Sequence, residues 1–140
     1  MKSIKETCFY NEVIKELIYP FGNIFIFQGF VVSEINRGVI FNWEDHGKII
    51  TEDIACFLGT NGGDLIYISN RIHPYSVFVT DWFKFFNNSY SLKSYFIVSQ
   101  NAIGIVNSLI ENLFFSTKIK RFRNIEMAVN YIKTGLVEIA

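Results

Sequence analysis

A polar loop near the middle of the chain carries the densest group of side chains able to do chemistry. It lies in YISNRIHPYSV, residues 67–77, where an apolar run gives way to polar residues. The candidates for a regulatory or anion-binding role are Asn70, Arg71, His73, Tyr75 and Ser76. A helix is predicted to begin near Thr80, and helix N-termini favour phosphate through free N–H groups and the helix dipole. A phosphate on Ser76 could then draw on Arg71. Alternatively, the Tyr75 and Ser76 hydroxyls only hydrogen-bond the loop to itself.

Arg71 directly follows an apolar strand that is predicted to be central in a sheet. As a switch residue it would bind an anion, and as a structural residue it would pair with a carboxylate. Glu34, at the end of an earlier predicted strand, is the candidate partner, because a guanidinium group can bind a carboxylate through two parallel hydrogen bonds. The structural ion pair is the favoured interpretation, and the anion-binding one stays open.

No catalytic constellation accompanies this loop. Ser76 stands three residues from His73 in a proline-containing loop, and the G-x-S-x-G elbow of hydrolases does not occur. The two histidines, His46 and His73, lack the spacing of metal ligands. The glycine-rich NGGD at residues 61–64 precedes a strand, whereas a phosphate-cradling loop follows one and opens a helix. The sequence therefore predicts no enzyme, no catalytic residue, no metal site and no cofactor.

Aromatic residues crowd a short predicted helix, DWFKFFN at residues 81–87. Trp82 and Phe86 are four residues apart and share one helix face, with Phe83 beside them. Burial in the core is the simplest interpretation, and an apolar pocket or a subunit contact is the alternative. In that case Phe115 could supply the opposite wall.

The composition is that of one globular domain with apolar side chains to spare. The chain has 140 residues, of which 50% are hydrophobic, 17% aromatic and only 19% charged. The surplus favours an oligomer or a partner surface, unless it only builds a phenylalanine-rich core. The net charge is zero, so nothing attracts polyanions over long range, and no nucleic acid is expected. The basic run KIKRFR, residues 118–123, is typical of an edge strand protected by its charges.

The expected location is the cytoplasm. Cys8 and Cys56 stand far apart and form no CxxC pair, which fits free thiols in a reducing compartment. The first residues contain no uninterrupted apolar stretch of signal-peptide length. No window approaches the roughly 18 apolar residues of a membrane-spanning segment.

The periodicity of the sequence predicts a mixed sheet. Strands are expected at residues 13–19, 23–27, 30–36, 64–69, 94–99 and 118–122, and helices at residues 42–59, 81–87, 100–115 and 124–136. Asn42 and Asn124 are the predicted N-caps, and Gly59 and Gly135 the predicted ends, of two of these helices. The first three strands should form an antiparallel meander, and the later strands should pair in parallel through helical crossovers. The prediction is a single α/β domain over residues 1–140, with about four helices, a core over about 14–134 and a lead segment over 1–13.

The string YISNRIHPYSV, followed by FIVSQN, ENLFF and NIEMAVNYI, resembles the SpoIIAA-like proteins. These are often described as STAS or SEC14-like domain proteins, and the closest likeness is to small members found in Bacteroidetes bacteria. The resemblance covers roughly residues 14–134 and rests on the order of elements and on the string N-R-x-x-x-Y-S. It implies a mixed sheet with helices, the same order that the periodicity predicts.

The resemblance implies a binding protein. The founding relatives bind a kinase-type anti-sigma factor and are switched off by phosphorylation of a serine at a helix N-terminus, whereas SEC14-like relatives hold a lipid in an apolar cavity. The Asp-Ser-Ser-Gly string of the former is replaced here by NRIHPYSV, and small relatives often continue Tyr-Ser-Val with Asp-Pro where this chain has Phe78 and Val79. Ser76 thus matches the phosphoserine by loop position only.

Three functions stay open. The first is a non-enzymatic binding or regulatory module of SpoIIAA-like fold that acts through protein–protein contacts. The second is a SEC14-like carrier of an apolar small molecule or lipid, whose cavity would be lined by Trp82, Phe83, Phe86 and Phe115. The third is a self-associating protein of structural role, a homodimer whose spare aromatic surface is the contact.

Overall fold

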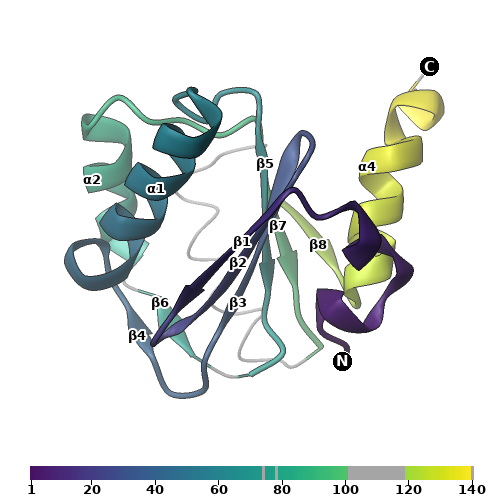
Figure 1. The fold of residues 1–140 in the computed structure, drawn as a ribbon, viewed down its shortest axis with the longest axis horizontal. Coiled ribbons are helices and arrows are strands. Elements are labelled where there is room, and N and C mark those ends of the chain that lie inside the picture. Colours follow the sequence, from purple (N-terminus) through teal and green to yellow (C-terminus); the bar gives the residue numbers. More distant parts are fainter. Residues whose placement is uncertain (74, 78, 101–118, 140) are drawn as a thin grey trace.

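A six-stranded mixed sheet forms the centre of the molecule (Figure 1). The computed structural model describes residues 1–73, 75–77, 79–100 and 119–139. Across the sheet the strands are β1 (Lys15–Tyr19), β2 (Gly22–Phe27), β3 (Phe30–Ile35), β5 (Ile66–Asn70), β7 (Ser94–Val98) and β8 (Ile119–Phe122). The first three strands pair antiparallel, and β3, β5, β7 and β8 pair in parallel. The predicted mixed sheet, with an antiparallel meander followed by parallel strands, is confirmed.

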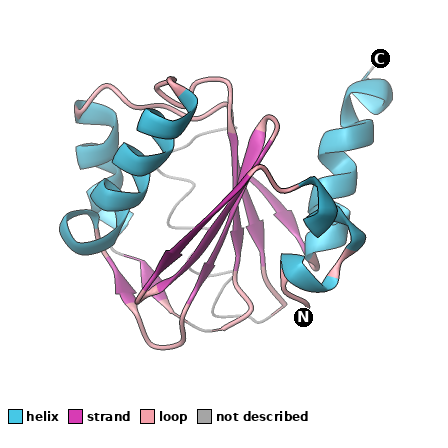
Figure 2. Ribbon diagram, viewed as in Figure 1, coloured by secondary structure: helices cyan, strands magenta, loops and turns pink. Residues whose placement is uncertain are grey.

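Helices cover both faces of the sheet (Figure 2). One face is covered by α1 (Lys48–Leu58) and α2 (Trp82–Asn87), which are preceded by a turn of π-helix, η3 (Trp43–Gly47), and a 3-10 turn, η4 (Val79–Asp81). The other face is covered by α4 (Ile125–Ile139) and the N-terminal 3-10 turns η1 (Ile4–Glu6) and η2 (Cys8–Glu12). These two layers are called the α1–α2 layer and the α4 layer below.

A small second sheet was not predicted. Two short strands, β4 (Ile40–Phe41) and β6 (Ser76–Val77), pair in parallel below the α1–α2 layer in Figure 1. The predicted polar loop is therefore partly strand, and the backbone N–H of Ser76 donates to the Val39 carbonyl at 3.0 Å.

Three of the four predicted helices are confirmed in position, although not in every boundary. The structure describes three α-helices instead of about four, and the helix expected at residues 100–115 lies almost entirely outside the described residues. Asn124 caps α4 through Met127 N–H as expected, but α4 continues past Gly135. Glycine costs only about 1 kcal/mol inside a helix. It ends a helix where the chain turns left-handed, as Gly59 does after α1 with φ of 69°.

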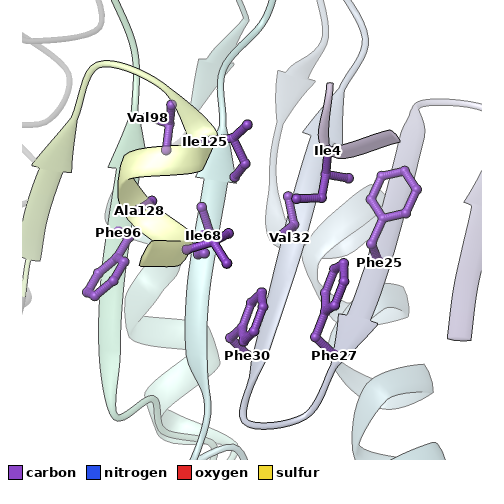
Figure 3. Packing of buried hydrophobic residues seen from close by; sticks show 11 residues of the cluster. Ile4, Phe25, Phe27, Phe30, Val32, Ile68, Phe96, Val98, Ile125 and Ala128 are labelled. Carbon is purple, nitrogen blue, oxygen red and sulfur yellow. The ribbon is translucent and has the colours of Figure 1, made fainter. Parts of the chain in front are cut away.

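Alternation along the strands divides the core between the two layers. The α4 side is built on phenylalanine rings, including Phe25, Phe27, Phe30 and Phe96, against Ile125 and Ala128 (Figure 3). The α1–α2 side packs Ile24, Ile26 and Val31 of the sheet against Ile50 and Ile54 of α1. Ile4 is fully buried on the α4 side, so the core includes part of the segment that was expected only to lead into the domain.

Phenylalanines are not all used in the core. Phe57, Phe83 and Phe86 keep 47%, 57% and 37% of their surface exposed, all in the α1–α2 layer. The surplus of apolar residues therefore builds a phenylalanine-rich core and also leaves aromatic side chains on the surface. The described part of the chain contains no helix with the length and hydrophobicity that a membrane span requires.

Candidate functional site

The residues of the predicted polar loop are divided between the two faces of the sheet. Ser69 and Arg71 point toward the α1–α2 layer, whereas Asn70 points toward the α4 layer, because successive side chains of a strand alternate. His73 and Ser76 are exposed beyond the end of β5. The candidates are thus close in sequence but do not form one cluster.

Arg71 is held in a buried corner at the carboxyl end of β5. Only 5% of it is exposed. Its Nε donates to Ser69 Oγ at 3.1 Å and its Nη2 donates to the Tyr95 hydroxyl at 2.8 Å. Its Cζ lies 5.5 Å from the centroid of the Tyr75 ring, and the Tyr75 hydroxyl is 2.6 Å from Ser69 Oγ. These contacts fit a structural role for Arg71, which fixes Tyr75 over the end of the sheet.

Glu34 is paired, but not with Arg71 as predicted. It accepts hydrogen bonds from Ser3 Oγ at 2.6 Å, from the Ile4 N–H at 2.7 Å and from Asn70 Nδ2 at 2.9 Å. The reason is strand parity: Ser33 is paired with Ser69, so Glu34 shares the face of Asn70 and lies opposite to Arg71. Glu34 therefore fastens the N-terminal turn to the sheet.

Ser76 is accessible, but its surroundings differ from those expected. It lies in the short strand β6 and not in the first turn of a helix. A strand backbone does not present the cluster of free N–H groups that a helix N-terminus offers to phosphate. Phosphorylation of Ser76 stays a prediction, without the helix dipole that was expected to support it.

An apolar pocket opens between the α1–α2 layer and the sheet. Its wall includes the apolar side chains of Phe41, Trp43, Ile50, Tyr67, Val77 and Phe85, and the polar residues Asn42, Thr51 and Asp81. The space within it that atoms do not fill is about 520 Å³, and this includes open solvent. Two of its lining residues join η3 to η4, since the Trp43 N–H donates to Asp81 Oδ2 at 2.8 Å.

Aromatic contacts extend from the pocket wall to the surface. The Phe85 ring meets Trp43 edge-on at 6.2 Å between centroids and stacks on Tyr90 at 5.7 Å. Phe86 meets Phe85 edge-on at 5.2 Å, so an exposed ring packs against a residue of the pocket wall. Phe83 is on the surface, while the Trp82 side chain and Phe115 lie outside the described residues. Phe83 and Phe86 are not among the residues that line this pocket, and their place in a pocket or at a subunit contact stays a prediction.

Charged residues lie beside this pocket, next to Asp81 of its wall. Lys84 Nζ lies 3.6 Å from Asp81 Oδ1 and 3.7 Å from Glu44 Oε1, so it bridges α2 and η3. Asn42 caps η3 by accepting from the Asp45 N–H at 2.9 Å. These exposed pairs contribute little stability, because water screens them. Their importance lies in the charge that they place beside an apolar opening.

His46 fixes the turn that carries Asn42 and Trp43. Its Nδ1 accepts from the Asn42 N–H at 3.1 Å, and its ring packs against Phe21 and Phe41 with centroids 4.6 and 5.3 Å away. Burial lowers the pKa of His46, and the nearby Asp45 carboxylate partly opposes this. The neutral imidazole is the form that can accept this hydrogen bond.

The described residues contain no group of three histidine, cysteine, aspartate or glutamate side chains placed to hold a metal ion. Both cysteines are exposed and free. The apolar pocket with its polar rim is therefore the candidate site, and its geometry suits binding.

Comparison of the chain with known proteins found no matching protein-family model, no matching curated protein and no matching solved structure. The fold and the pocket define an α/β protein with a mixed sheet and an apolar surface pocket.

Proposed function

We propose that the chain is a non-enzymatic binding module of SpoIIAA-like, STAS-like fold, which works in the cytoplasm through protein–protein contacts. The observation that carries the proposal is the open apolar pocket, together with the exposed Phe86 that packs against Phe85 of its wall. Protein interfaces concentrate their binding energy in bulky side chains that fill such pockets, and polar residues surround these anchors. Asn42, Asp81 and Lys84 provide that polar surround.

The architecture supports the family part of the proposal. The antiparallel meander β1–β3 followed by parallel strands and helices is the order that the resemblance to SpoIIAA-like proteins implies. The two exposed, unpaired cysteines, Cys8 and Cys56, support a reducing compartment.

A carrier of an apolar small molecule is the second candidate, because the pocket wall is mostly apolar. A carrier site encloses most of the surface of its ligand. Here part of the pocket volume is open solvent, and Phe83 and Phe86 stand outside instead of closing it. A pocket of this shape suits one side chain of a partner better than a whole lipid.

Site-specific photocrosslinking in the native host tests the proposal. Phe86 is replaced by the photocrosslinker p-benzoylphenylalanine, and Met127 on the opposite α4 layer is replaced in the same way as the matched control. We expect one protein adduct from position 86 and not from position 127. Thr51→Phe, which fills the pocket from α1, should remove the adduct while far-UV circular dichroism stays unchanged.

Each other outcome contradicts the proposal. An adduct of equal strength from position 127, or one that survives Thr51→Phe, places the contact elsewhere. An adduct between two copies of the chain supports self-association, and the absence of any adduct at position 86 removes the proposed surface.

A further inference from the structure

The layer that contains the pocket is acidic. The exposed acidic residues between η3 and β5 are Glu44, Asp45, Glu52, Asp53 and Asp64, and Lys48 is the only lysine or arginine between residues 42 and 64. Because the chain as a whole is neutral, the balancing cations lie elsewhere, and three of them are Lys120, Arg121 and Arg123 at β8. An acidic surface on a neutral protein favours cationic partners.

Lys84 shows how a cation sits at the pocket mouth. Its ammonium group lies between the carboxylates of Asp81 and Glu44, at 3.6 and 3.7 Å. Lys84 and Glu44 are well exposed, with 49% and 63% of their side chains accessible. Distances of this length in an exposed pair mark a weak interaction that another cation can replace. The two carboxylates thus form a cation position directly beside the apolar opening.

We infer that the partner docks a segment in which a bulky apolar side chain is flanked by lysine or arginine residues. The apolar side chain enters the pocket between Trp43 and Phe85, and a flanking cation displaces Lys84 from Asp81 and Glu44. This inference rests on the proposed function, because it names the chemistry of the partner at the same pocket. An anionic segment would meet Glu44 and Asp45 at the rim and would be repelled.

Capped peptides test this with the full chain. The probes are GKKFKKG, its acidic analogue GEEFEEG and its alanine analogue GKKAKKG, each acetylated and amidated. Binding is followed by nuclear magnetic resonance at the Trp43 indole N–H and at the Ile50 and Val77 methyl groups, which line the pocket. We expect GKKFKKG to shift these signals with at least fivefold higher affinity than either analogue, and to weaken as salt is raised from about 0.1 to about 1 M.

Charge variants test whether Lys84 competes with the cation of the peptide for Asp81 and Glu44. Lys84→Gln removes the competing cation, so the affinity for GKKFKKG should rise about twofold to fivefold, the range of one exposed ion pair. Glu44→Gln should lower it by a similar factor. Glu126→Gln makes the same charge change on the α4 layer and serves as the matched control, with no change expected.

The failures of the inference and of the proposed function are distinguishable. If GEEFEEG binds as well as GKKFKKG, or if Lys84→Gln weakens binding, the cationic partner is overturned while docking at the pocket stands. If no peptide shifts the pocket signals at millimolar concentration, both the inference and the proposed pocket docking are overturned.

Discussion

Two charged side chains, Glu34 and Arg71, hold neighbouring elements of this fold in place. Glu34 gathers three hydrogen bonds from the N-terminal turn and β5, and Arg71 joins β5 to Tyr95 on β7. The two residues work on opposite faces of the sheet, so each holds a different layer. Hydrogen bonds to charged groups are among the stronger ones in proteins, and losing one partner leaves the others unsatisfied.

Glu34→Ala should detach the N-terminal turn. The Ile4 N–H loses its acceptor and the Asn70 amide keeps only the Lys2 carbonyl, and we expect a loss of about 2–3 kcal/mol in the free energy of unfolding. Urea unfolding measures it. Glu12→Ala removes an exposed pair with Lys133 and should cost less than about 0.5 kcal/mol. Equal effects of the two substitutions would show that Glu34 does not fasten the turn.

Arg71→Ala should lower the free energy of unfolding by more than about 2 kcal/mol, because the buried guanidinium fills the corner and bonds two hydroxyls. Arg71→Lys should not restore it, since a lysine cannot reproduce the planar fork. Arg123→Ala, at an exposed position, is the control. An unchanged melting temperature in Arg71→Ala would return Arg71 to an anion-binding role.

His46 should make the stability of the fold depend on pH. The pKa of His46 is lowered in the folded state from about 6.5 in the unfolded chain, so the unfolded chain takes up the proton more readily. The contribution of the neutral imidazole is therefore complete above about pH 6.5 and is lost as the pH falls toward the folded pKa. His46→Gln should flatten the fall in unfolding free energy between about pH 7 and about pH 5. His73→Gln, at an exposed position, should not, and an identical slope in both variants would contradict this account.

The residues of the site were only partly predictable. The loop candidates were found because polar types cluster after an apolar strand, but alternation already places Arg71 and Asn70 on opposite faces. Ser33 pairs with Ser69, and alternation from this pair puts Glu34 and Arg71 on opposite faces of the sheet, which excludes an ion pair between them. The sequence did not reveal this, because the register between two strands is a property of the whole sheet and not of the local sequence. The pocket residues Trp43, Tyr67 and Phe85 come from three elements, so no local pattern marks them.

At the scale of elements, the segment between α1 and β5 is a tightly constrained connection. Gly59 ends α1 with φ of 69°, and Gly62 follows with φ of 96°. A Cβ on Gly62 would lie 2.3 Å from the Ser91 carbonyl oxygen, whereas a Cβ on Gly59 would meet nothing within 4 Å. The loop thus packs its backbone against the segment that enters β7.

Gly62→Ala should therefore lower the free energy of unfolding more than Gly59→Ala does. Gly59→Ala places an alanine in the left-handed conformation without any clash of its Cβ, which should lower the free energy of unfolding by about 1 kcal/mol. Gly62→Ala adds a clash with backbone that cannot move without shifting Ser91, and we expect about 2–4 kcal/mol. Thermal unfolding of the two variants compares them. Similar melting temperatures would mean that the Ser91 segment yields easily.

Elements were predicted better than the site because their signals are local. The β-branched and aromatic runs at β1–β3, the Asn42 cap and the left-handed Gly59 all appear where periodicity placed them. The pair β4–β6 was missed because each strand has only two residues and depends on a partner about 35 positions away.

At the scale of the whole molecule, the sheet separates two layers with different tasks. The α4 layer closes a phenylalanine-rich core with the N-terminal turns. The α1–α2 layer closes a smaller core and keeps an apolar pocket, an acidic rim and exposed aromatic residues. We expect substitutions in the α1–α2 layer to change partner binding, and substitutions in the α4 layer to change only the free energy of unfolding.

Native mass spectrometry of the protein isolated from its own host is the decisive test of docking at the pocket. We expect a complex with another protein chain, which the pocket-filling Thr51→Phe dissociates while the folded monomer survives. A chain that releases a small apolar molecule on denaturation would instead support the carrier. A homodimer, or a complex that Thr51→Phe leaves intact, would contradict docking at the pocket.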